Sequence, residues 1–145
     1  MENKRYKPLI GKMFFIIWVP TLILLFAATV ISASYITALL IILATDIFTL
    51  YFLISPLFGY VELREDEVFV KLGFFTTVEI PYNKIRAVVK ERKLYADSLI
   101  SLKNSLDHVN IKYNRFDVLS VSVVDNDELI DMIKTKNSDV QTESF

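Results

Sequence analysis

The sequence predicts an α+β protein in which an N-terminal hairpin of two apolar helices precedes a small antiparallel β-domain closed by one C-terminal helix. Two stretches, residues 13–31 and 35–57, are apolar over about the 20 residues that a helix needs to cross the hydrocarbon core of a bilayer. From Tyr60 onward, apolar and polar residues alternate with a period of two, as in half-buried strands. Near the C-terminus the period lengthens to that of an amphipathic helix.

The two apolar stretches predict a membrane hairpin, because only residues 32–34 separate them and Asp46 is the one ionisable residue within them. Residues 1–12 carry four basic residues and one acidic residue. Lys and Arg close to the end of a span stay on the cytoplasmic side of a membrane. We therefore expect two spans in the cell membrane, with both termini in the cytoplasm. The absence of cysteine excludes disulfides and cysteine metal ligands.

A signal peptide is the competing interpretation of the first stretch, because small residues at positions 32–34 resemble a cleavage site. The apolar run exceeds the roughly 7–15 residues of a signal peptide, and a second apolar stretch follows at once. Cleavage would leave a singly anchored chain, so the two interpretations differ in topology.

Asp46 is predicted to make a polar contact inside the membrane, because a charge at mid-bilayer costs about 2.5–3.5 kcal/mol. Folding the hairpin about Ala33 brings Asp46 near the depth of Pro20 and Thr21. A protonated Asp46 can then bond the Thr21 hydroxyl, or the Ile16 carbonyl that proline leaves without a donor. Adhesion between the two helices is the simplest role, and docking to another membrane protein is the alternative.

The β-domain is expected over residues 59–134, because strand patterns follow one another between turn residues. The expected strands cover residues 60–64, 68–72, 76–80, 85–91, 108–113 and 118–123. Asp125, with Glu128 three residues later, is typical of a helix N-cap with a capping-box partner. The helix is expected to run to about Lys134, and residues 135–145 are expected to form a flexible, frayed tail.

Three segments resemble bacterial pleckstrin-homology-like (PH-like) domains of the YyaB-like type. Residues 73–89 contain Gly-Phe-Phe and then Ile-Pro-Tyr-Asn-Lys-Ile before Val-Val, residues 105–113 read Ser-Leu-Asp-His-Val-Asn-Ile-Lys-Tyr, and residues 121–130 form a strand-to-helix close. The resemblance implies a PH-like antiparallel barrel or sandwich capped by the C-terminal helix. It also implies that N-terminal spans are common in similar proteins.

The sequence departs from the family pattern at two places. The resemblance therefore indicates a fold more than it indicates a function. His108 stands where the family usually has Arg, and residues 121–123 read Val-Ser-Val where Ile-Ser-Pro is usual. PH-like folds bind phosphoinositides, proteins or no known ligand, and the fold alone does not choose between these alternatives. A related branch of bacterial PH-like proteins acts in bacteriocin immunity and envelope stress, which keeps that role open by analogy.

Catalysis is not expected from this sequence. His108, the only histidine, shares its strand face with Asn110 and Lys112 in the alternation, so we expect it to be solvated. Asp107 points to the opposite face, which leaves His108 without the positioned partner that a general base needs. The sequence has no glycine-rich phosphate loop, no Gly-x-Ser-x-Gly motif and no metal-ligand cluster. No cofactor and no metal are expected.

Five basic residues within ten positions are the candidate contacts for lipid or for a partner: Lys84, Arg86, Lys90, Arg92 and Lys93. Four of them have the same parity, which would place them on one strand face if the strand has no bulge. Each basic residue near an anionic leaflet contributes about 1 kcal/mol. An ordinary solvated face gives the same pattern, and residues 58–145 carry 12 basic and 15 acidic residues, a net charge of −3.

A second candidate contact is an apolar stretch in an otherwise irregular segment, made of Leu94, Tyr95, Leu99 and Ile100. It either fills the core or forms an exposed patch for a partner helix or the bilayer surface. The sequence thus predicts a non-catalytic, membrane-anchored PH-like scaffold or adaptor that acts through protein contacts. The alternative is an anionic-lipid-binding or bacteriocin-immunity module. The expected partners are the bilayer, another membrane protein or a second copy of the chain, and anionic phospholipid, but no nucleic acid.

Overall fold

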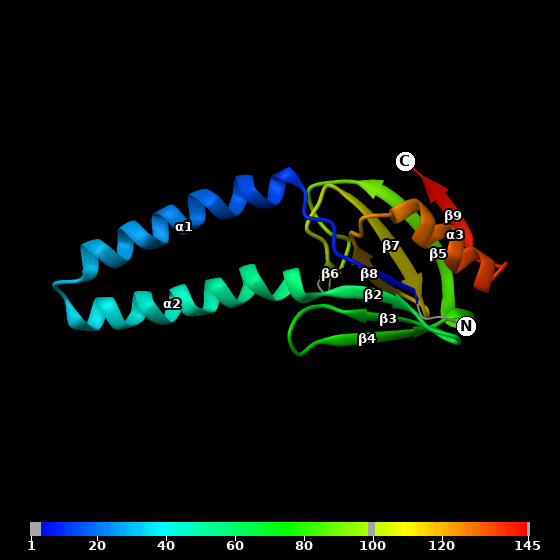
Figure 1. The fold of residues 1–145 in the computed structure, drawn as a ribbon, viewed down its shortest axis with the longest axis horizontal. Helices are drawn as coiled ribbons and strands as arrows, with labels where there is room; N and C mark the ends of the chain where they lie inside the picture. The colour runs from blue at the N-terminus through cyan, green and yellow to red at the C-terminus, as the bar shows by residue number, and fades with distance from the viewer. Residues whose placement is uncertain (1–3, 99–100, 145) are drawn as a thin grey trace.

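The computed structural model describes residues 4–98 and 101–144, and it consists of a long helical hairpin and a β-sandwich. The hairpin extends from one end of the sandwich, while the chain ends lie on the sandwich (Figure 1). Both described ends of the chain are therefore on the same side of the hairpin. The predicted order of a helical hairpin, an antiparallel β-domain and a final helix is confirmed.

The hairpin consists of α1 (Lys12–Ser32) and α2 (Ile36–Ile54), and a short 3₁₀ turn, η1 (Ser55–Phe58), continues α2 into the domain. Neither helix has a buried residue, although both are almost wholly apolar. A core helix of a soluble protein would bury its apolar side chains. Both helices are long and apolar enough to cross a membrane. Two segments suited to a membrane are therefore present close to the predicted positions.

The first sheet contains four antiparallel strands in the order β1-β2-β3-β4. The strands are β1 (Lys4–Tyr6), β2 (Tyr60–Leu63), β3 (Glu67–Lys71) and β4 (Thr77–Pro81). β1 was not predicted, since residues 1–12 were interpreted only as a basic segment. Its register pairs Arg5 with Glu62 of β2, and the Arg5 guanidinium bonds that carboxylate at 2.8 and 3.0 Å. The N-terminal segment is therefore part of the domain.

The second sheet has the order β6-β8-β7-β5-β9. After η2 (Tyr82–Lys84), its strands are β5 (Ile85–Arg92), β6 (Ser101–Leu102), β7 (Asp107–Tyr113), β8 (Asp117–Val121) and β9 (Gln141–Ser144). β9 pairs with β5 in parallel. The prediction of a frayed tail from residue 135 is therefore wrong for residues 141–144, because these residues pair with the free edge of β5 and form a strand.

The core lies between the two sheets and under α3 (Asn126–Lys136). Leu129 and Ile133 of α3 are fully buried among Val and Ile side chains of both sheets. The sheets form an open sandwich and not a closed barrel. Asp125 holds the predicted N-cap position, but its side chain makes no capping bond. Instead, Asn126 Oδ1 accepts a hydrogen bond from the backbone N–H of Val123 at 3.0 Å.

Both helices of the hairpin are held by the domain where they enter it. Before α1, the backbone of residues 7–11 bonds residues that follow β6 and β8, including Gly11 N–H to Asn104 O at 2.8 Å. After α2, Ser55 Oγ accepts the backbone N–H of Phe74, in the β3–β4 loop, at 3.2 Å. A Cβ on Gly73 would lie 2.0 Å from that same oxygen. The loop and η1 are thus in close contact, which fixes the domain relative to the hairpin.

Candidate functional site

The five basic candidate residues do not share one strand face. Lys84 belongs to η2, before β5 begins. The register of β5 on β7 shifts between Ile85 and Ala87, so Arg86 is the extra residue of a bulge. The condition for a common face, a strand without a bulge, is therefore not met, because the bulge reverses the parity of every later residue relative to Arg86.

Three of these basic residues have carboxylate partners. Lys90 Nζ lies 2.6 Å from Asp127 Oδ1, Lys93 Nζ lies 2.8 Å from Glu91 Oε2, and Arg92 Nε lies 3.8 Å from Asp107 Oδ1. The bond to Glu91 raises the pKa of Lys93. Lys84 and Arg86 are exposed, and none of the ion pairs found among the described residues involves them. The cationic charge of this stretch is therefore available chiefly at its first two members.

Position along β5 separates these residues in space. β5 begins at the end of the domain opposite to the hairpin and curves back toward it (Figure 1). The available cations thus lie at the end of the strand far from the apolar helices, and the paired ones lie toward the helices.

A buried polar network occupies the outer face of β5, β7 and β8. The alternation of β7 is as predicted, with Val109 and Ile111 in the core and His108 and Asn110 on the other face. That face was expected to be solvated, but His108 and Asn110 are both 0 % exposed. The expectation is wrong because the segment after β5 folds over this face and contributes Asp97 to it.

Asn110 is the centre of this network. Its Oδ1 accepts the hydroxyl of Ser120 at 2.6 Å, and its Nδ2 donates to Glu91 Oε2 at 3.0 Å and to Asp97 Oδ2 at 2.8 Å. Lys93 adds a positive charge to the same two carboxylates, at 2.8 and 3.6 Å. The network therefore ties the loop after β5 to three neighbouring strands.

His108 is held in place by one hydrogen bond of its ring. Its Nδ1 lies 2.8 Å from the Leu106 carbonyl, so Nδ1 carries the hydrogen. Its Nε2 is buried without a hydrogen-bond partner, 3.9 Å from Glu91 Oε2. Within the described ranges, no group of three His, Asp or Glu side chains is placed to share a metal ion.

The apolar candidate patch is exposed at its first two residues. Leu94 is 63 % and Tyr95 65 % exposed, and Lys93 Nζ lies 5.7 Å from the centre of the Tyr95 ring. Leu99 and Ile100, the other two residues of the candidate patch, lie outside the described residues.

Asp46 bonds Thr29 and not the predicted Thr21. Thr29 Oγ1 donates to Asp46 Oδ2 at 2.7 Å, whereas Thr21 Oγ1 donates to Ile17 O within its own helix at 2.8 Å. The prediction assumed equal numbers of residues on either side of Ala33. Thr29 lies eight residues, about two helical turns, nearer the connection than Thr21.

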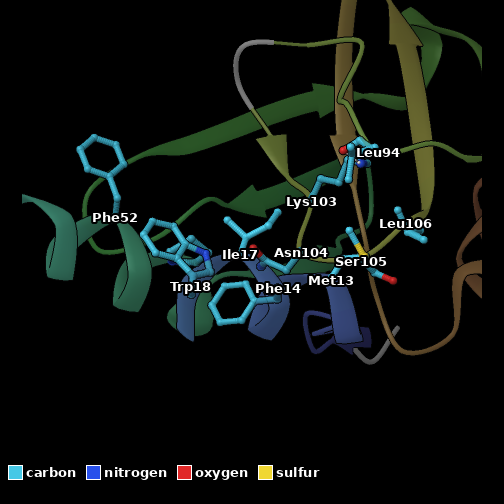
Figure 2. Close-up of a pocket in the computed structure, with 11 residues that line it drawn as sticks. Met13, Phe14, Ile17, Trp18, Phe52, Leu94, Lys103, Asn104, Ser105 and Leu106 are labelled. Atoms are coloured by element: carbon cyan, nitrogen blue, oxygen red, sulfur yellow. Dashed lines mark hydrogen bonds between the residues drawn. The ribbon is translucent and has the colours of Figure 1, made fainter. Parts of the chain in front are cut away.

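A cavity of about 200 Å³ lies at the junction of the hairpin and the domain. Phe14, Ile17 and Trp18 of α1 form its apolar side, and residues 103–106 form its polar side (Figure 2). Lys103 Nζ donates to the carbonyls of Lys93 and Leu94, both at 2.8 Å, and burial lowers its pKa. Sequence reasoning missed this site, since its two sides are about 90 residues apart in the chain.

A cluster of aromatic rings from α2, η1 and the β3–β4 loop also lies where the hairpin meets the domain. Tyr51 of α2 stacks on Phe75 of the β3–β4 loop with ring centres 6.5 Å apart, and Phe74 contacts Tyr51 and Phe58 at 5.9 and 5.0 Å. Phe75 is nevertheless 85 % exposed. The apolar surface of the hairpin thus continues onto the nearest loop of the domain.

The fold and the exposed hairpin together define the class of protein. A two-sheet sandwich with a C-terminal helix is a PH-like fold, and two exposed apolar helices are consistent with a membrane-associated PH-like module. The family model described as bacterial PH domain matches residues 59–137, more than half of the 145 residues. The chain therefore belongs to the bacterial PH domain family. A comparison with curated proteins found no match.

Proposed function

We propose that the protein is a non-catalytic adaptor of the cell membrane, of the YyaB-like type, which crosses the bilayer through α1 and α2 and acts through protein contacts. The exposed apolar surface of both helices supports the two spans. The basic residues of the N-terminal segment favour a cytoplasmic location for the domain and both termini.

The distribution of positive charge along β5 supports a protein partner more than a lipid. A lipid-binding surface needs its cations on the side that faces the membrane. Here the exposed cations of residues 84–93 that have no ion pair among the described residues, Lys84 and Arg86, precede or begin β5, at the end of the domain away from the hairpin (Figure 1). A partner in the cytoplasm can reach them, whereas the membrane that holds the hairpin cannot.

The surface around Arg86 has the mixed polarity of a protein contact. Arg86 lines an open hollow with Asn83, Asn137, Asp139 and Gln141. Such a surface offers both hydrogen-bond donors and acceptors, and arginine is enriched in protein interfaces. Asn137 bonds the carbonyls of Tyr82 and Ile85 at 2.7 and 3.3 Å, which holds the hollow in shape.

The test is purification of the tagged full chain from its host membranes in mild detergent, with mass spectrometry of co-purifying proteins and lipids. The comparison uses wild type, Arg86→Glu and the control Lys134→Glu, which reverses another exposed charge on α3. A stoichiometric protein kept by wild type and by Lys134→Glu but lost with Arg86→Glu supports the adaptor. Enriched anionic lipid without any protein partner contradicts it.

The topology has its own test. A cytoplasm-dependent reporter fused after Phe145 is expected to be active in the full chain. Activity of a periplasm-dependent reporter at the same position would remove the two-span arrangement with both termini in the cytoplasm. Loss of a tag fused before Met1 from the mature protein would show instead that residues 13–31 act as a cleaved signal.

A further inference from the structure

The cavity between the hairpin and the domain lies at the depth of lipid headgroups if the hairpin spans the membrane as proposed above. α1 has 21 residues, a length of about 31 Å, which matches the hydrocarbon core of about 30 Å. The first turn of α1 therefore lies at the boundary between acyl chains and headgroups. Phe14 of that turn lines the cavity, and Trp18, about 6 Å further along α1, lines it among the acyl chains.

The polar side of the cavity presents a cation without a carboxylate partner. Lys103 Nζ uses two of its three N–H donors on backbone carbonyls. Among the salt bridges of the described residues, none includes Lys103, and Asp97 acts on it only from longer range. A partly buried ammonium in this state is stabilised by an anion that accepts its third hydrogen.

Asn104 supplies a second donor on the same side. Its Nδ2 is buried and has no hydrogen-bond partner among the described residues, which costs free energy unless an acceptor is present. Its backbone carbonyl holds Gly11 N–H at 2.8 Å, immediately before α1 begins. The first turn of α1 contains no acidic residue, so the positive end of its helix dipole adds to the charge of Lys103.

We propose that this cavity binds one anionic phospholipid of the inner leaflet, with the phosphate at Lys103 and Asn104 and an acyl chain along Phe14, Ile17 and Trp18. The apolar side of the cavity continues onto the lipid-exposed surface of α1. A soluble anion would leave that side unfilled, whereas a phospholipid matches both sides. The bound lipid fills the junction that orients the domain.

Trp18 is the only tryptophan of the chain and lines the cavity, which makes it a specific probe. The full chain is reconstituted in phosphatidylcholine bilayers that contain a small fraction of brominated lipid, a quencher of tryptophan fluorescence. Brominated phosphatidylglycerol is expected to quench Trp18 about fivefold more effectively, per molecule, than brominated phosphatidylcholine, as one Lys–lipid contact predicts. Lys103→Met is expected to abolish this preference, while Lys84→Met and Lys103→Arg retain it.

Each result has a defined meaning. Equal quenching by both lipids in wild type, or an unchanged preference in Lys103→Met, overturns the inference while leaving the proposed function intact. If Lys103→Met does not fold, Asn104→Leu takes its place, with a preference reduced at least twofold as the expected result and an unchanged one as the contrary result. Loss of the preference in millimolar glycerol 3-phosphate would assign the site to a soluble phosphate compound. Failure of the chain to insert into bilayers would remove both proposals.

Discussion

Asn110→Ala tests whether the buried polar network holds the outer face of the second sheet. The change removes three hydrogen bonds, namely those to Ser120, Glu91 and Asp97. Ser120 is 0 % exposed, so its hydroxyl would lose its acceptor without gaining water. An unsatisfied buried group costs about 1–3 kcal/mol, and a bond to a charged group contributes about 1.5–3 kcal/mol.

The expected total is smaller than the sum of these values. Lys93 continues to pair with both carboxylates, and Asp97 can regain water because its side chain is 33 % exposed. We therefore expect a loss of about 3 kcal/mol in the free energy of unfolding. For a domain of this size, the midpoint of thermal unfolding should fall by roughly 10–20 °C.

The measurement is thermal unfolding of the full chain in mild detergent, followed by near-ultraviolet circular dichroism. Ser120→Ala combined with Asn110→Ala should cost little more than Asn110→Ala alone, because both changes remove one shared bond. A loss below about 0.5 kcal/mol for Asn110→Ala would refute the reasoning. It would mean that the three bonds do not hold the loop on the sheet.

Three further predictions concern the hairpin and the first sheet. Gly73→Ala should lower the unfolding midpoint by several degrees, because its Cβ would displace Ser55 Oγ from Phe74 N–H, and hydrogen exchange at the β3–β4 loop should rise with it. Asp46→Asn should leave hairpin stability within about 0.5 kcal/mol of wild type in sodium dodecyl sulfate titration, since its amide oxygen still accepts the Thr29 hydroxyl, whereas Asp46→Leu should cost about 1 kcal/mol. Arg5 lowers the pKa of the Glu62 carboxyl through their hydrogen bonds. The ionised carboxylate therefore stabilises the fold fully above the ordinary pKa of glutamate, and this stabilisation is lost as the pH falls through the lowered pKa. Glu62→Gln should therefore weaken the acid dependence of unfolding below about pH 4.3, and an unchanged acid limb would contradict this.

Local patterns predicted most of the fold because each element has its own period. The alternation in β7 correctly assigned Val109 and Ile111 to one face and His108 and Asn110 to the other. It did not show which faces are covered. A sheet face is exposed or buried according to what packs on it. The segment after β5 has no regular pattern of apolar residues from which this packing could be predicted.

The short strands near the two ends of the chain could not be predicted from the sequence, for a related reason. β1 has three residues and β9 has four, which is too short for a periodic signal. Each forms because an edge of a sheet is available: β1 pairs with β2, and β9 pairs with β5. The edges exist only once the rest of the domain has folded, so their partners cannot be read from residues 4–6 or 141–144 alone.

The bulge in β5 shows how one local irregularity changes an inference about function. Without it, Arg86 would share a face with Lys90 and Arg92, and the strand would present a continuous cationic row. With it, Arg86 is the extra residue at the start of the strand, while Lys90 lies beside α3 and pairs with Asp127. Lys90 and Arg92 then have carboxylate partners within the fold, and the unpaired charge of this stretch lies at the start of β5, at the end of the domain away from the hairpin (Figure 1). A contact through Arg86 therefore should depend on salt and on charge reversal there, and should be insensitive to the lipid composition of the membrane.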